Sequence, residues 1–214
     1  MSYVQLGIDQ SLFTLTLTRI AQKNALSLEM YTELVDAFER FENDDSLKVL
    51  IIQGDAQCFC AGNDLKDFMA GGVLDESHPT VRFIRAIANC SKPVFAAVAG
   101  PAIGIGTTML LHCDFVVAAD NSRFQLPFAK LGLCPEAGSS LLLTHLAGGR
   151  IAFELLVMGQ GFDAHQAERL GLVNRVCTPD DLLSLARDKA LEVSRLPSDA
   201  VLASKALIRQ SMQT

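Results

Sequence analysis

The sequence predicts an α/β fold with a helical C-terminal region. Strand and helix patterns alternate up to about residue 120, whereas helical patterns dominate after the mostly apolar stretch 124–140. With 214 residues, half of them hydrophobic, the chain is long enough to bury a sizeable core.

The N-terminal third contains the clearest strand and helix signals. Residues 13–17 alternate apolar side chains with threonines and predict a half-buried strand, which pairs as a hairpin with a short strand at 3–8. Ser27 is placed to cap a helix that carries an apolar stripe to Phe41. The run Val49–Ile52 is apolar throughout, as in a strand covered on both faces.

Further elements follow in order. We expect a helix from about Asp64, a mobile surface loop at 69–79 and a helix at 80–89 with Val81, Ile84 and Ile87 inward. A strand at 94–99, a short helix at 107–112 and a strand at 115–119 follow. The helical C-terminal part contains two helices separated by 147–149, a helix at 164–170 capped by Asp163, a strand at 173–176, a helix at 180–196 and a last helix capped by Ser198.

Composition limits the function classes. A formal net charge of −6 and a pI near 5.2 argue against nucleic acid as a partner, since phosphate binding needs a basic face. We expect no signal peptide and no membrane span, because no apolar run approaches the ~20 residues needed. The six cysteines form no CxxC pair and the four histidines show no ligand spacing, which favours a cytoplasmic protein with no metal site.

Glu136 is the most informative acidic residue. It follows Pro135 in an apolar run, and the nearest basic residue before it in sequence is Lys130. A glutamate buried there has a raised pKa and can take and return a proton. The alternative is a solvated acid in a loop or in the first turn of a helix.

Two glycine-marked loops each follow a buried strand. The first is Ala61-Gly62-Asn63-Asp64, and the second begins at Gly100 and contains Gly104 and Gly106. Such loops are either tight turns or places where a ligand meets backbone N–H groups, and two facing loops would form an oxyanion hole. Neither a Walker A loop nor the G-x-G-x-x-G fingerprint is present, because Thr107 and Met109 occupy the required Lys and Gly positions.

Taken in order, several short segments make the chain resemble the crotonase (enoyl-CoA hydratase/isomerase) superfamily. The segments are Arg19 with Lys23-Asn24-Ala25-Leu26, Phe59 to Leu65, Lys92-Pro93-Val94, Gly100 to Gly104, Cys113-Asp114 and Gly171-Leu172-Val173. The resemblance implies a repeated ββα spiral core over 1–196, followed by the start of a helical assembly region at 197–214. That region is shorter than in the family, whose members form trimers or dimers of trimers.

The resemblance also implies site residues. Backbone N–H groups of Asn63 and Ile105 would hold the carbonyl oxygen of an acyl-CoA thioester, which is the substrate, and no cofactor is implied. Coenzyme A would lie along Lys23, Ala25, Ala61, Gly62, Asn63, Asp64, Leu65 and Gly104. Lys23 is either a phosphate contact or an exposed loop lysine. The acyl pocket would be lined by Leu126, Phe128 and Leu133.

The carboxylates decide which reaction is implied. Hydratases resemble one another in using two glutamates, and Thr108 and Phe128 stand at those positions here. Glu136 instead resembles the single acid of the Δ3,Δ2-enoyl-CoA isomerase branch of fatty acid metabolism. Alternatives are another acyl-CoA reaction (weak hydratase, decarboxylase or thioesterase), in which Thr108 or Cys134 assists a water, and a binding module without turnover.

Overall fold

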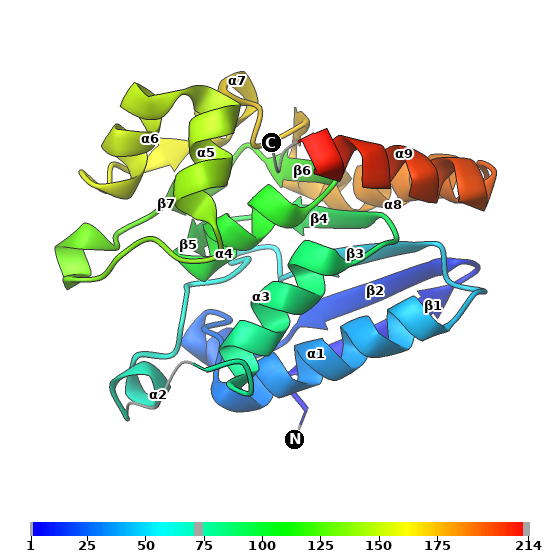
Figure 1. Ribbon diagram of the computed structural model, residues 1–214, viewed down its shortest axis with the longest axis horizontal. Coiled ribbons are helices and arrows are strands. Elements are labelled where there is room, and N and C mark those ends of the chain that lie inside the picture. Colours follow the sequence, from blue (N-terminus) through cyan, green and yellow to red (C-terminus); the bar gives the residue numbers. More distant parts are fainter. Residues whose placement is uncertain (1, 71–74, 212–214) are drawn as a thin grey trace.

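The computed structural model describes residues 2–70 and 75–211, and Figure 1 shows their arrangement. The strands are β1 (Val4–Asp9), β2 (Leu12–Leu17), β3 (Val49–Gln53), β4 (Val94–Val98), β5 (Pro101–Ile103), β6 (Phe115–Ala119), β7 (Arg123–Gln125), β8 (Phe162–Asp163) and β9 (Arg175–Cys177). The α-helices are α1 (Leu28–Asn43), α2 (Leu65–Ala70), α3 (Pro79–Asn89), α4 (Ile105–Thr108), α5 (Ser139–Ala147), α6 (Gly149–Leu156), α7 (Ala164–Leu170), α8 (Leu182–Ser194) and α9 (Ser198–Ser211).

The strands of the described residues form a large and a small sheet. The large one has six strands in the order β1-β2-β3-β4-β6-β9. Strands β1 and β2 pair antiparallel as the predicted hairpin, and every later pair in this sheet is parallel. The parallel strands place their carboxyl ends at one edge of the sheet, and the glycine-marked loops leave β3 and β4 at that edge.

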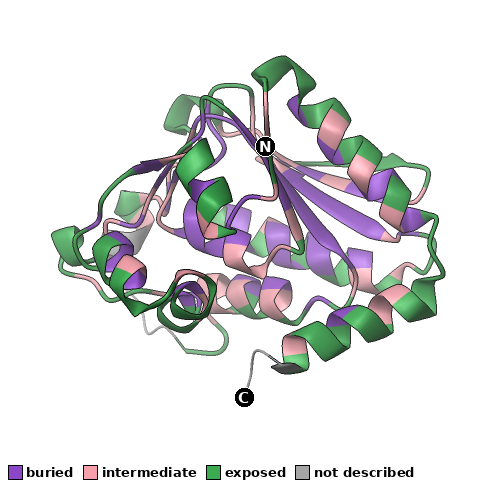
Figure 2. Ribbon diagram, turned by 90° about the horizontal axis from the view of Figure 1, so that it is seen from above, coloured by how far each residue is buried: buried purple, intermediate pink, exposed green. Residues whose placement is uncertain are grey.

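Helices cover both faces of the large sheet, which explains its apolar strands. On one face, Val49 and Ile51 of β3 pack in a cluster with Leu182 and Ala186 of α8. On the other face, Leu50 and Ile52 of the same strand join the main core together with side chains of α1 and α3. Figure 2 shows the buried strands between exposed outer helix faces. Alternate residues of β3 therefore pack into two separate hydrophobic clusters, one on each face of the sheet.

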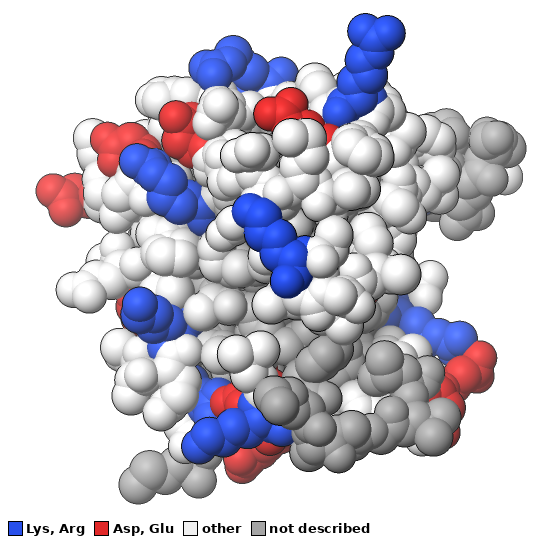
Figure 3. Space-filling model, turned by 90° about the vertical axis from the view of Figure 1, so that its left-hand side faces the viewer, with Lys and Arg blue, Asp and Glu red and all other residues white. Residues whose placement is uncertain are grey.

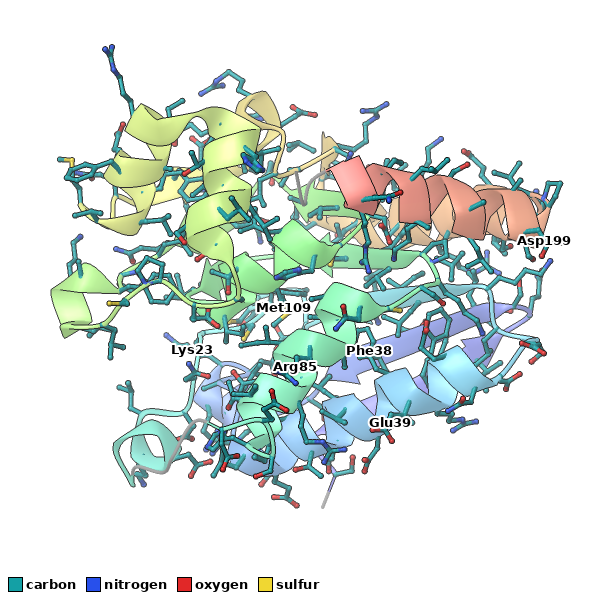
Figure 4. All side chains as sticks on the ribbon, viewed as in Figure 1. Lys23, Phe38, Glu39, Arg85, Met109 and Asp199 are labelled. Carbon is teal, nitrogen blue, oxygen red and sulfur yellow. The ribbon has the colours of Figure 1, made fainter. Side chains whose placement is uncertain are left out.

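Helix α1 is amphipathic and begins as predicted. The Ser27 side chain accepts a hydrogen bond from the Met30 N–H at 3.3 Å, which caps the first turn. Phe38 is buried, whereas its neighbour Glu39 is exposed on the outer side of the helix (Figure 4). The apolar stripe thus fixes which face of α1 meets the sheet.

Helix α9 is attached to the core by cations. The buried Lys205 ammonium lies 2.5 Å from an Asp114 carboxylate oxygen and donates to the Lys92 carbonyl at 2.6 Å. Arg209 donates to the carbonyls of Ala88 and Cys90, at the C-terminal end of α3. These contacts satisfy helix-end carbonyls and dock the last helix.

Several predictions needed correction. The small sheet β5-β7-β8 was not predicted, because strands of two or three residues carry no measurable periodicity. In α3, Phe83 is buried with Ile87, whereas Val81 and Ile84 are only half-buried, because the ring of Phe83 packs on α1.

Boundaries also shifted. Helix α4 begins at Ile105, before the expected residue 107, and β9 begins at Arg175 rather than at 173. Of the loop expected at 69–79, residues 71–74 lie outside the described residues. Among the described helices, none has the length and apolar character required to cross a membrane.

Candidate active site

The two glycine-marked loops lie against each other. The Ile103 N–H donates to the Cys60 carbonyl at 2.9 Å, and Cys60 pairs with Ala102 as an isolated bridge. Gly106 is required for this approach, because a Cβ there would lie 2.5 Å from the Cys60 carbonyl oxygen. Gly62 has a φ of +103°, which side-chain-bearing residues rarely adopt. The expected proximity of the loops is confirmed.

Each loop contains backbone N–H groups for which the described residues provide no acceptor, and those of Asn63 and Ile105 are among them. Around Asn63, the Asp64 N–H donates to the Leu26 carbonyl and the Leu26 N–H donates to the Gly62 carbonyl, each at 2.8 Å. Ile105 is the first residue of α4, where an N–H has no intrahelical partner. Within the described residues no hydrogen bond uses the N–H of Asn63 or Ile105. Both are therefore able to donate to an oxyanion.

The backbone around Glu136 forms a fixed turn before α5. The Glu136 carbonyl accepts from the Ser139 N–H at 3.0 Å and from its hydroxyl at 2.7 Å. Ala137 has a φ of 52°, and its carbonyl lies 2.8 Å from the ring Nε2 of His112. The turn aims the Glu136 side chain back toward α4.

The carboxylate of Glu136 accepts a hydrogen bond from a hydroxyl group. Thr108, the fully buried last residue of α4, donates through Oγ1 to Glu136 Oε1 at 2.5 Å. Among the described residues, no lysine, arginine or histidine forms an ion pair with it. Burial raises the pKa of Glu136 to about 7, although the Thr108 hydrogen bond opposes the rise. Glu136 is half-buried, and with a raised pKa its carboxyl can both accept and release a proton near neutral pH.

Two further side chains of the site come from elsewhere in the chain. The buried hydroxyl of Tyr31, on α1, donates to the side-chain oxygen of Asn63. Burial raises the pKa of Tyr31 well above its usual value, and the charge of the Glu136 carboxylate adds to the effect. Burial likewise raises the pKa of Cys60 to about 12. Sequence reasoning missed Tyr31 because its position in the stripe of α1 is that of a core residue, although a buried hydroxyl needs a partner.

Comparison with known proteins shows which family this chain belongs to. A model of the enoyl-CoA hydratase/isomerase family matches residues 7–214. The chain belongs to this family, the crotonase superfamily. It is a crotonase-type acyl-CoA enzyme, as the resemblance of its short segments implied.

Relatives of this family with different names are about equally similar. The 2,3-dehydroadipyl-CoA hydratase of Escherichia coli is 34% identical over 216 residues, covering 100% of this chain and 84% of the relative. The 1,2-epoxyphenylacetyl-CoA isomerase of the same organism is 33% identical over 205 residues, covering 92% and 78%. Sequence similarity alone therefore does not select one reaction of the family.

Solved crotonase-family structures share the fold. Pseudomonas aeruginosa OdaA superposes with a TM-score of 0.96 at 40% identity, covering 99% of this chain and 86% of that one. An enoyl-CoA hydratase/isomerase from Pseudoalteromonas atlantica superposes with a TM-score of 0.94 at 39% identity, with the same coverage. The predicted α/β crotonase fold with its helical C-terminal region is confirmed.

The crotonase segments expected to meet coenzyme A converge on one corner. The Ala61 N–H donates to the Lys23 carbonyl at 3.0 Å. Arg19 donates to the Ala25 carbonyl at 2.9 Å and to the Asp64 carboxylate at 2.6 Å. Arg19, which was not among the predicted site residues, therefore joins the two segments.

Charge and exposure differ among the predicted contact residues of this crotonase chain. Lys23 is exposed and lies at the left-hand side of the view in Figure 4. On the left-hand face, lysines and arginines are scattered, and several of them adjoin acidic side chains (Figure 3). Leu65 is 63% exposed, whereas Gly104 is half-buried and donates through its N–H to the Gln125 carbonyl at 2.9 Å.

The three predicted lining residues lie in or against the main core. Leu126 and Phe128 are buried in it, and Leu133 is half-buried and packed on it. Between these side chains and Glu136, residues 129–132 and 134–135 are exposed.

Proposed function

We propose that this protein is an enoyl-CoA isomerase that moves a double bond from C3 to C2 of an acyl-CoA thioester, with Glu136 as its single base and acid. The proposal rests on a carboxylate of raised pKa that has no ion-pair partner among the described residues and that is hydrogen-bonded to α4, the helix that begins at the Ile105 N–H. No second carboxylate is among the groups that shift its pKa. One carboxylate is sufficient for an isomerisation, which consumes no water.

The reaction is a proton transfer along an allylic system. Glu136 removes a proton from C2 of the 3-enoyl thioester, and the electron pair of that C–H bond delocalises into the thioester as a dienolate. The protonated carboxyl then returns the proton to C4, which leaves the double bond between C2 and C3. A pKa of about 7 serves both steps, since the group must be a base first and an acid second.

The thioester oxygen carries the negative charge of the dienolate. The N–H groups of Asn63 and Ile105 supply fixed donors for that charge, and such donors stabilise the transition state without reorganisation. Leu126, Phe128 and Leu133 are proposed as the apolar lining around the acyl chain, where a dry environment keeps the carboxyl protonatable.

Coenzyme A is proposed to lie along the corner of Lys23, Ala25, Ala61 and Leu65. The paired loops present mainly backbone there, and Lys23 is free to approach a phosphate. Asp64 is proposed to order the loop, because its carboxylate accepts from the Lys66 N–H at 2.9 Å at the start of α2.

The test uses Glu136→Gln with a 3-enoyl-CoA substrate. The amide keeps the shape of the side chain and removes the base, so kcat falls by about 10²–10⁴-fold while KM changes little. Glu136→Asp keeps the carboxyl group but shortens the side chain, so we expect its kcat to lie between that of the wild type and that of Glu136→Gln. Retention of most isomerase activity in Glu136→Gln would contradict the proposal.

Hydration is the second candidate, because the similar E. coli relative is named a hydratase. In that reaction Thr108 Oγ1 and Glu136 would hold a water between them. No second carboxylate is among the groups that shift the pKa of Glu136, which disfavours hydration. Formation of a 3-hydroxyacyl-CoA from a 2-enoyl-CoA at a rate above that of isomerisation would select hydration over the isomerase.

Assembly into a trimer or a dimer of trimers is proposed as well. Helices α5 and α6 pack together and expose a set of large apolar side chains, namely Leu141, Leu146 and Phe153. Exposed apolar surface of this kind is typical of subunit contacts. Size-exclusion chromatography with light scattering tests the proposed assembly. A mass equal to that of one chain would contradict it.

A further inference from the structure

Tyr31 lies between the two functional parts of the site and has no place in the proton transfer itself. Its phenol is 1% exposed and its hydroxyl donates to the side-chain oxygen of Asn63. Its ring centroid lies 5.6 Å from that of Phe83, on α3. A phenol held by two helices is a rigid support for whatever it binds.

The loop that carries Asn63 is otherwise held by backbone contacts, which reach the second glycine-marked loop through Cys60 and the segment before α1 through Leu26 and Asp64. The Leu26 and Asp64 N–H groups tie it to the segment before α1, and Arg19 ties Asp64 to the same segment. In addition to these backbone contacts, the Tyr31 hydroxyl holds the side chain of Asn63 by a hydrogen bond. It thus constrains the residue whose N–H is left without an acceptor.

We infer that Tyr31 is a positioning residue, which holds Asn63 so that its N–H and that of Ile105 point to the same oxygen atom. The inference rests on the proposed function, since the oxygen is that of the thioester. A hydroxyl that donates to Asn63 is also kept from donating to the nearby Glu136 carboxylate, which stays available to the substrate. Tyr31 therefore acts through Asn63 and does not contact the substrate.

The kinetic test is a double-mutant cycle on a 3-enoyl-CoA. Tyr31→Phe keeps the packing on Phe83 and removes one hydrogen bond, so we expect kcat to fall roughly 5- to 10-fold with KM nearly unchanged. Asn63→Ala keeps the backbone N–H and removes the acceptor, with a similar loss. In the Asn63→Ala background, Tyr31→Phe then has no further effect on kcat. An equal further loss in that background overturns the inference.

The structural test is amide hydrogen exchange and needs no substrate. We expect faster exchange of the Leu26 and Asp64 N–H groups in Tyr31→Phe, because their loop has lost its side-chain support. The matched control is Tyr3→Phe, a change at the only other tyrosine of the sequence, which leaves both exchange rates and kcat unaltered.

The two proposals fail separately. If the wild-type protein isomerises no enoyl-CoA, the proposed function fails, and exchange alone decides the role of Tyr31. Faster exchange of the two amides in Tyr31→Phe than in Tyr3→Phe supports the positioning role, and equal exchange in the two variants overturns it.

Discussion

Asp64 and Glu136 are carboxylates on two sides of the same candidate site, and their partners differ. The Asp64 carboxylate lies 2.6 Å from the Arg19 guanidinium, whose hydrogen bond lowers the pKa of Asp64. Glu136 has a hydroxyl as its partner, and burial raises its pKa to about 7. Because Arg19 pairs with Asp64, Asp64 stays a carboxylate anion that orders its loop. Glu136 has no such cation among the described residues, so its carboxyl can exchange protons near neutral pH.

The largest expected difference between Glu136 and Asp64 is in how the free energy of unfolding depends on pH. Folded Glu136 keeps its proton up to a pKa of about 7, whereas an ordinary glutamate releases it near 4.5. Between these values the folded state binds more protons, so stability falls as pH rises, by roughly 3 kcal/mol at most. Glu136→Gln removes this loss, and we expect the variant to be more stable than wild type at pH 8 but not at pH 4.

Urea unfolding of both proteins at the two pH values measures the difference. Because all other groups titrate alike in wild type and variant, the comparison isolates Glu136. A variant whose stability relative to wild type is the same at both pH values would show that Glu136 has an ordinary pKa.

Loss of the paired carboxylate has a smaller and different effect. Asp64→Asn breaks the ion pair with Arg19 and lowers the free energy of unfolding by about 1–3 kcal/mol. The depressed pKa of Asp64 means that its contribution is present throughout the neutral range and is lost only as pH falls through that lowered pKa. KM for the acyl-CoA rises while kcat is largely kept, because the loop and not the base is affected.

The matched control for that variant is Glu76→Gln. Glu76 and Arg85 form an ion pair of similar length, 2.7 Å, but their side chains are 79% and 55% exposed. Exposed pairs contribute little to stability, because water and salt screen their charges. Equal destabilisation by both substitutions would remove the structural distinction drawn for Asp64.

Thr108 gives the smallest expected effect. Its hydrogen bond lowers the pKa of Glu136 against the effect of burial, so Thr108→Val raises that pKa further. The base form is then reached only at higher pH, and the rising limb of kcat/KM against pH moves to higher pH. Thr108→Ser keeps the hydroxyl and the wild-type profile. An unshifted profile in Thr108→Val would show that the hydroxyl does not act on the carboxyl.

The sequence predicted the large elements, for identifiable physical reasons. Long periodic segments such as α1 and the runs Val49–Ile52 and Val94–Val98 carry strong burial patterns. The apolar run around Glu136 pointed to this carboxylate, which is half-buried in the structure. What remained hidden depends on long-range contacts: the sheet β5-β7-β8, the bond from Thr108 and the bond from Tyr31, which join residues 28 and 32 positions apart.

A titration of the Glu136 carboxyl carbon tests the central claim most directly. Carbon-13 NMR of protein labelled at glutamate carboxyls, with Glu136→Gln to assign the signal, follows this group without any substrate. The account predicts a midpoint near the pKa of about 7 that burial imposes on Glu136. A midpoint near the usual glutamate value of 4.5 would contradict it, because such a carboxyl could not readily return a proton at neutral pH.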